Sequence, residues 1–121
     1  MDIKERVVEG ISVLDISGKI VLGEGDGQVK ERIKDLLADG QKRILLNLGD
    51  VSYIDSAGLG ALISSYTTSR RGGGQLKLVN LTKRIQDLLS ITKLITVFDT
   101  YETEREAIAS YKPAEAGPAA E

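Results

Sequence analysis

The sequence predicts an α/β domain with a mostly parallel central sheet. After residue 17, short apolar runs of strand length alternate with stretches whose apolar residues recur every three or four positions, as on one face of a helix. One run, residues 43–48, is apolar at nearly every position, which is typical of a strand covered on both faces. Before them, two β-like runs at residues 3–8 and 11–17 are separated by Glu9-Gly10 and predict an antiparallel hairpin.

A loop and a first helix follow the hairpin. Residues 23–27 read Gly-Glu-Gly-Asp-Gly and predict a flexible loop. The helix is predicted from the spacing of Val29, Ile33 and Leu36, and Gly40 is well placed to end it.

The buried strand at 43–48 leads to the pair Asp55-Ser56 and then to a second helix. Its buried stripe is predicted to consist of Leu59, Leu62, Ile63 and Tyr66. Arg70-Arg71 suit its C-terminus, where cations complement the helix dipole. The remaining hydroxyl residues of this helix are expected to form an exposed polar flank: Ser64, Ser65, Thr67 and Thr68.

The C-terminal part is predicted to add two strands and two helices, about four helices in all. Residues 75–81 and 96–98 have the composition of strands. Thr82 is expected to cap a third helix, and Thr103 with Glu106 fits a capping box that opens a last helix reaching Tyr111. We expect one domain over residues 1–112 and a disordered tail over 113–121, which is rich in Pro, Ala, Gly and Glu.

Composition narrows the functional classes. The chain has 121 residues, enough for one core, and a net charge of −2, which gives no overall positive field for nucleic acid. It has no Cys and no His, so disulfides, thiolate metal sites and a Ser-His-Asp triad are excluded. No apolar run approaches the roughly 20 residues of a membrane span, and the first residues lack a signal-peptide segment. We expect a cytoplasmic protein that binds neither membrane nor nucleic acid directly.

The pair Asp55-Ser56 is the strongest candidate site. Functional loops of parallel sheets gather at the carboxyl ends of strands, so the 23–27 loop and Asp55-Ser56 are predicted to lie side by side. At a helix entrance, free N–H groups and the positive end of the dipole tolerate a phosphate on Ser56. Ser56 could instead simply cap the helix, which would contribute about 1 kcal/mol. Asp55 could be either a turn former or a charge used in partner docking.

Glycines near this pair suggest close backbone approach. We expect Gly60 to serve packing and Gly58 to give a partner access. The 23–27 loop lacks the Lys-Ser/Thr ending of a phosphate loop, and Glu24 and Asp26 would repel phosphate. This loop is therefore expected to contact a protein partner.

Residues 54–60, Ile-Asp-Ser-Ala-Gly-Leu-Gly, with the downstream Gly-Gly-Gly-Gln-Leu-Lys-Leu-Val, resemble the STAS domain of bacterial anti-sigma factor antagonists. The likeness runs from about residue 11 to about residue 111, and it implies the STAS fold, with a mostly parallel sheet and an N-terminal hairpin. The family commonly reads Gly-x-Leu-Asp after its second strand. Here Gly18-Lys19-Ile20 is followed by Val21, so the acid is absent, and Glu24 or Asp26 is a possible substitute.

The resemblance implies a partner-switching regulator of transcription and not an enzyme. Unphosphorylated, such a protein binds an anti-sigma factor, usually a serine kinase; the kinase phosphorylates the motif serine, here Ser56, and a serine phosphatase resets it. The phosphate donor and metal belong to the kinase, so no cofactor or metal is expected in this chain. The expected partner-binding residues are Asp55, Ser56, Ala57, Gly58, Glu24 and Asp26.

Two alternatives remain from the sequence. The chain could be a constitutive STAS scaffold or transporter accessory module that binds without reversible phosphorylation. It could also be a small enzyme that uses Asp55 or Ser56 on phosphorylated ligands, which the missing His, Cys and phosphate-loop Lys disfavour.

Overall fold

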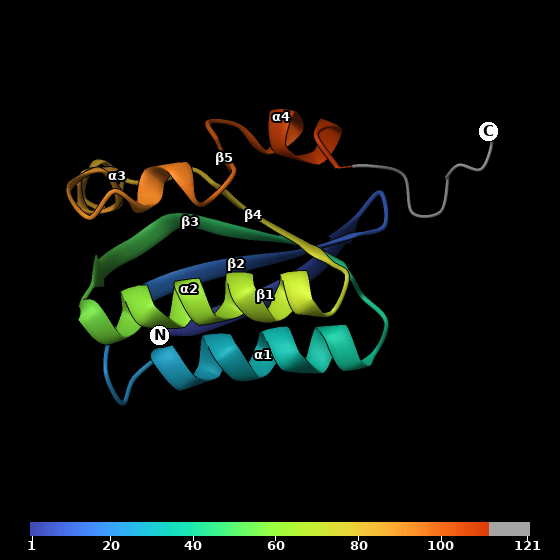
Figure 1. Ribbon diagram of the computed structural model, residues 1–121, viewed down its shortest axis with the longest axis horizontal. Helices are drawn as coiled ribbons and strands as arrows, with labels where there is room; N and C mark the ends of the chain where they lie inside the picture. Colours follow the sequence, from blue (N-terminus) through green and yellow to red (C-terminus); the bar gives the residue numbers. More distant parts are fainter. Residues whose placement is uncertain (112–121) are drawn as a thin grey trace.

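The protein is described by a computed structural model over residues 1–111. Its elements follow the predicted alternation of strand and helix (Figure 1). They are β1 (Asp2–Val8), β2 (Ile11–Ile20), α1 (Asp26–Ala38), β3 (Arg43–Ile54), α2 (Ser56–Arg71), β4 (Gln75–Val79), α3 (Lys83–Ile91), the 3₁₀ helix η1 (Leu94–Thr96), β5 (Thr100–Tyr101) and α4 (Glu104–Ala109). The predicted tail at 113–121 lies outside the described residues.

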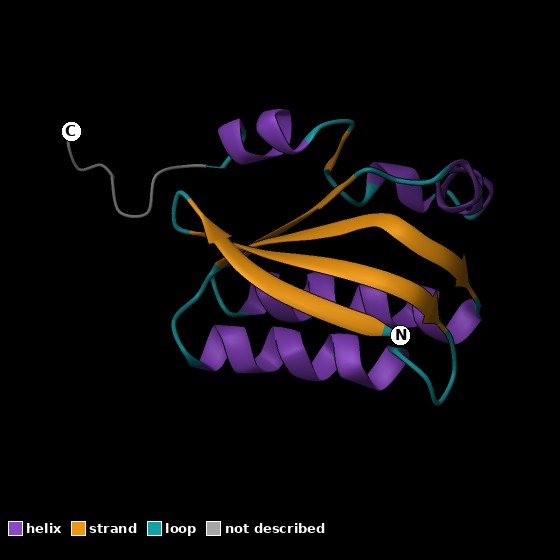
Figure 2. Cartoon of the chain, turned by 180° about the vertical axis from the view of Figure 1, so that it is seen from behind, coloured by secondary structure: helices purple, strands orange, loops and turns teal. Residues whose placement is uncertain are grey.

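One five-stranded sheet carries the domain, in the order β1-β2-β3-β4-β5. The pair β1 and β2 is antiparallel and every other pair is parallel, which confirms the predicted hairpin and sheet. The strands β2, β3 and β4 are neighbours in the sheet in the same order as in the sequence. Right-handed crossovers between them therefore place α1 and α2 on the same face of the sheet. Figures 1 and 2 show these two helices side by side across that face, with α4 on the other side.

Two apolar clusters lie on the two faces of the sheet. The larger one joins the sheet to α1, α2 and α3, and the smaller one lies under α4. Strand β3 contributes to both, because Ile44 and Leu46 face the larger cluster while Leu45 faces the smaller one. This two-sided burial explains the continuous apolar run of the strand.

The predicted strand at 96–98 is wrong. Leu94–Thr96 form η1, and Phe98 is buried with its ring edge-on to Tyr66, at 5.3 Å between ring centroids. The last strand is Thr100–Tyr101, which pairs only with Leu78 and Val79 of β4. A side chain that anchors a turn in the core has the same apolar signature as a strand residue, so the pattern alone could not separate them.

Both threonine caps are confirmed. The side chain of Thr82 accepts a hydrogen bond from the Ile85 amide, and that of Thr103 accepts one from the Glu106 amide. The last helix, however, ends at Ala109 and does not reach Tyr111 as predicted. Tyr111 is buried beyond the helix, where its hydroxyl donates to the Ile44 carbonyl.

Small residues line the buried side of α2. Ser64 and Thr67 are exposed as predicted, but Thr68 is half-buried and the prediction is wrong for Ser65, which is buried, as is Ser69. Ala61 is buried on the same helix. Short side chains at these positions allow α2 to pack close to its neighbours, and serine serves here as a small residue.

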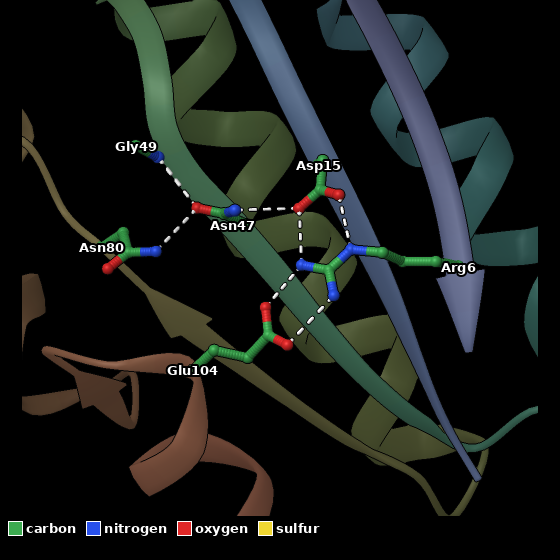
Figure 3. Close-up of polar contacts among 6 residues, drawn as sticks. All are labelled: Arg6, Asp15, Asn47, Gly49, Asn80 and Glu104. Carbon is green, nitrogen blue, oxygen red and sulfur yellow. Dashed lines mark hydrogen bonds and ion pairs between the residues drawn. The ribbon is translucent and has the colours of Figure 1, made fainter. Parts of the chain in front are cut away.

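A polar network ties the hairpin to the C-terminal helix (Figure 3). The Arg6 guanidinium donates to both oxygens of Asp15, at 2.7 and 3.1 Å, and to both oxygens of Glu104. Asn47 donates to Asp15 and accepts from the side chain of Asn80 and from a backbone amide in β3. Hydrogen bonds from Arg6 lower the pKa of both the Asp15 and the Glu104 carboxyl groups.

The Arg6→Met variant should lose stability in a pH-dependent way. Carboxyl groups whose pKa is lowered in the folded state stabilise it above their ordinary values near 4, and this contribution is lost as pH falls through the lowered values. The stability difference between wild type and variant should therefore be largest above about pH 5 and should shrink below about pH 4. Urea unfolding from pH 3 to 7 measures it.

A matched control is Arg32→Met. Arg32 makes a single contact of 3.2 Å with Glu5 between partly exposed side chains, so its loss should cost less than about 1 kcal/mol. A difference between wild type and Arg6→Met that stays constant over the whole pH range would contradict the role given to the network.

Candidate functional site

Strand β3 passes into α2 through a single residue, Asp55. Asp55 has extended backbone and is the N-cap of α2, and its Oδ1 accepts a hydrogen bond of 2.8 Å from the Gly58 amide. Its Oδ2 accepts a second bond of 3.0 Å from the Leu22 amide, in the loop after β2. One carboxylate therefore joins the start of α2 to the neighbouring loop.

These two bonds stabilise the charged form of Asp55. The Gly58 amide, followed by the Leu22 amide, holds the pKa of the Asp55 carboxyl below its ordinary value. Asp55 is thus an anion at neutral pH. It fulfils the predicted role of a turn former; its predicted contribution to docking stays a prediction.

Ser56 is the first residue of α2 and is exposed. The alternative in which Ser56 caps the helix is wrong, because Asp55 occupies the cap and makes the capping bond. Both Asp and Ser are preferred N-cap residues, so the sequence Asp-Ser did not decide which of the two caps the helix. As a result, the Ser56 hydroxyl lies at the positive end of the helix dipole without the capping role.

The loop after β2 lies beside Asp55-Ser56, as predicted, and both are at the left end of the sheet in Figure 1. In the structure this loop is hydrogen-bonded as a turn; its predicted flexibility stays a prediction. Val21 and Glu24 exchange two backbone hydrogen bonds of 2.9 Å, which closes a tight turn. The Gly23 amide donates to Asp26 Oδ1 at 3.1 Å, and Asp26 already begins α1. We call residues 21–26 and 55–57, where the sequence predicts partner docking, the docking rim.

The remaining predicted site residues take different positions on this rim. Glu24 is exposed in the turn, whereas Asp26 and Ala57 are partly buried. Asp26 Oδ1 accepts from the Gly23 amide, and Glu24 Oε2 lies 3.4 Å from the Met1 ammonium, so both acids of the loop already have a partner within the chain.

The packing role predicted for Gly60 belongs to Gly58. Gly58 is buried, and a Cβ added to it would lie 1.9 Å from the Ile20 carbonyl oxygen, so Gly58 allows α2 to approach β2. Gly60 is exposed, with no atom within 4 Å of such a Cβ. Gly58 therefore shapes the rim from beneath, and the expectation that it faces a partner is wrong.

Sequence reasoning missed Leu22, which stands on the rim with 76% of its surface exposed. The signal was a single large apolar residue directly before a glycine-rich loop. Tyr53, close before Asp55, was also missed and is 43% exposed, with the Arg84 guanidinium 5.7 Å from its ring centroid.

The described part of the chain contains neither a cluster of metal-ligating residues nor a helix able to span a membrane. Among residues 1–111, no three carboxylates are placed to share a metal ion. None of the helices in that range combines the length and apolar character needed to cross a bilayer.

Comparison with known proteins now decides the family. A family model described as the STAS domain matches residues 2–107. The chain belongs to the STAS-domain family. An anti-sigma-B factor antagonist of Bacillus subtilis is 37% identical over 71 residues, which is 59% of this chain and 64% of that relative.

Two solved structures share this fold. A candidate anti-sigma factor antagonist from Thermotoga maritima superposes with a TM-score of 0.81 at 27% identity, over 88% of this chain and 92% of that one. The phosphorylated form of the Bacillus cell fate determinant SpoIIAA superposes with a TM-score of 0.69 at 20% identity, over 89% of this chain and 97% of that one. The second likeness is one of fold alone. A relative from Thermotoga neapolitana, named as an anti-sigma factor antagonist, is 30% identical over 103 residues, which is 85% of this chain and 91% of that relative, so the chain belongs among STAS domains of the anti-sigma factor antagonist type.

Proposed function

We propose that this chain is a cytoplasmic anti-sigma factor antagonist whose partner binding is switched off by phosphorylation of Ser56. Unphosphorylated, it binds an anti-sigma factor that is also a serine kinase, and so releases a sigma factor. The observation that carries the proposal is the exposed Ser56 at the start of α2, with the helix cap supplied by Asp55.

The physical chemistry of this position favours a local switch. A phosphate on Ser56 adds about −1.5 to −2 charge beside the ionised Asp55. Within the chain, the α2 dipole and its N-terminal amides offset part of that charge, so the fold tolerates it. A partner surface closed over Ser56 has no such compensation and also meets extra bulk, so docking is lost while the fold persists.

Relatives support this reading. The Bacillus subtilis relative is named an anti-sigma-B factor antagonist, and SpoIIAA, which shares the fold, was solved in a phosphorylated form. The role is regulatory and depends on contact between proteins, with the kinase supplying ATP and metal and a serine phosphatase removing the phosphate.

Calorimetric titration tests the proposal. The unphosphorylated chain should bind a purified anti-sigma factor kinase encoded in the same genome, and it should displace the sigma factor from that kinase. Absence of binding to every such kinase would contradict the proposal. Tight binding that phosphorylation leaves unchanged would favour the alternative, a constitutive STAS scaffold or transporter accessory module.

A further inference from the structure

Leu22 is an apolar side chain held out from the molecule by an ordered turn. It is 76% exposed, so it adds little to the core. Single exposed apolar residues are common on protein surfaces and carry no meaning by themselves. Leu22 differs because of how its backbone is fixed and because of what lies beside it.

Several hydrogen bonds hold the turn that carries Leu22. Val21 and Glu24 exchange two backbone bonds, the Gly23 amide donates to Asp26, and the Leu22 amide itself donates to Asp55. A residue whose backbone is already ordered loses little conformational entropy when a partner covers it. Burial of an apolar side chain held in this way gains transfer free energy with a smaller ordering cost.

The position of Leu22 relative to Ser56 is set by a shared carboxylate. Asp55 Oδ2 accepts from the Leu22 amide, and Asp55 Oδ1 accepts from the Gly58 amide in the first turn of α2, which Ser56 begins. A stable interface buries about 800 Å² on each partner, a patch with a radius of about 16 Å. A partner whose contact patch is centred on the Ser56 hydroxyl therefore reaches Leu22 as well.

We propose that Leu22 is the apolar anchor of the docking rim, which inserts into an apolar pocket of the anti-sigma factor kinase beside the cleft that receives Ser56. The inference rests on the proposed function and names a residue that sets partner affinity and choice.

The test uses three variants of the full chain. Leu22→Ser removes the anchor, and Leu22→Met keeps an apolar side chain of similar volume. Val7→Ser is the matched control, because Val7 is 65% exposed but pairs with Ser12 at the amino end of β2, whereas Leu22 follows the carboxyl end of that strand. Each variant is titrated with the purified anti-sigma factor kinase that binds the wild type, and its melting temperature is measured.

Leu22→Ser should raise the Kd at least about tenfold, because a small polar side chain replaces an apolar one that the partner would bury. Leu22→Met and Val7→Ser should stay within about threefold of wild type, and all three should keep the wild-type melting temperature. In steady-state phosphorylation of Ser56, Leu22→Ser should raise KM and leave kcat unchanged.

The outcomes separate the two proposals. If the wild type binds the kinase and Leu22→Ser binds equally well, the anchor is overturned and the proposed function stands. If no anti-sigma factor kinase binds the wild type, both are overturned. If Leu22→Ser unfolds, Leu22 belongs to the folded core and the anchor is overturned as well.

Discussion

Gly58→Ala should lower the free energy of unfolding by about 2–3 kcal/mol. The added Cβ would lie 1.9 Å from the oxygen and 2.8 Å from the carbon of the Ile20 carbonyl. Both atoms belong to the backbone of β2 and cannot rotate away, so α2 must move off the sheet. That movement should also disrupt the hydrogen bond between the Leu22 amide and the Asp55 carboxylate, so partner binding should weaken as well.

Gly60→Ala is the matched control on the same helix. Gly60 is exposed, with no atom within 4 Å of an added Cβ, so the variant should gain about 0.5–1 kcal/mol from helix propensity alone. Urea unfolding of the two variants measures the contrast. Equal effects of the two substitutions would contradict the close approach of α2 to β2.

Ser56→Asp should weaken binding of the anti-sigma factor kinase at least about 100-fold, because juxtaposed like charges or an uncompensated anion cost several kcal/mol in an interface. The free energy of unfolding should change by less than about 0.5 kcal/mol. A carboxylate in the first turn of a helix is favourable, and this gain offsets repulsion from Asp55.

Ser64→Asp carries the same charge change on the same helix. Ser64 is exposed in the middle of α2, away from the docking rim, so binding should remain within about threefold of wild type. Titration calorimetry and thermal unfolding of both variants separate docking from stability. Equal losses of binding in both variants would show that net charge, and not the position of Ser56, governs the interaction.

Periodicity predicted most of the fold because burial here follows the simple rules of a covered parallel sheet. Residues 43–48 face apolar layers on both sides, and the stripe of α2 faces one of them. The prediction of a strand at 96–98 was wrong because it used burial as a sign of strand structure. Phe98 is buried against Tyr66 from a turn, and burial without regular pairing leaves the same apolar signal.

The candidate site was predicted in position but not in detail. Spacing placed Asp55 and Ser56 at a helix entrance, but the choice of cap depends on one backbone conformation, which neither residue type dictates. The roles of Gly58 and Gly60 depend on which side of α2 meets β2, a tertiary fact. The order of the 21–26 turn arises from long-range bonds such as that between Leu22 and Asp55, which no local pattern encodes.

Intact-mass and peptide-mapping analysis after incubation with the cognate kinase and ATP tests the central claim most directly. We predict one added phosphate, located on Ser56, and a phosphorylated protein that keeps its melting temperature but no longer binds the kinase. Phosphate on another residue, or a phosphorylated Ser56 that leaves the complex intact, would contradict the account.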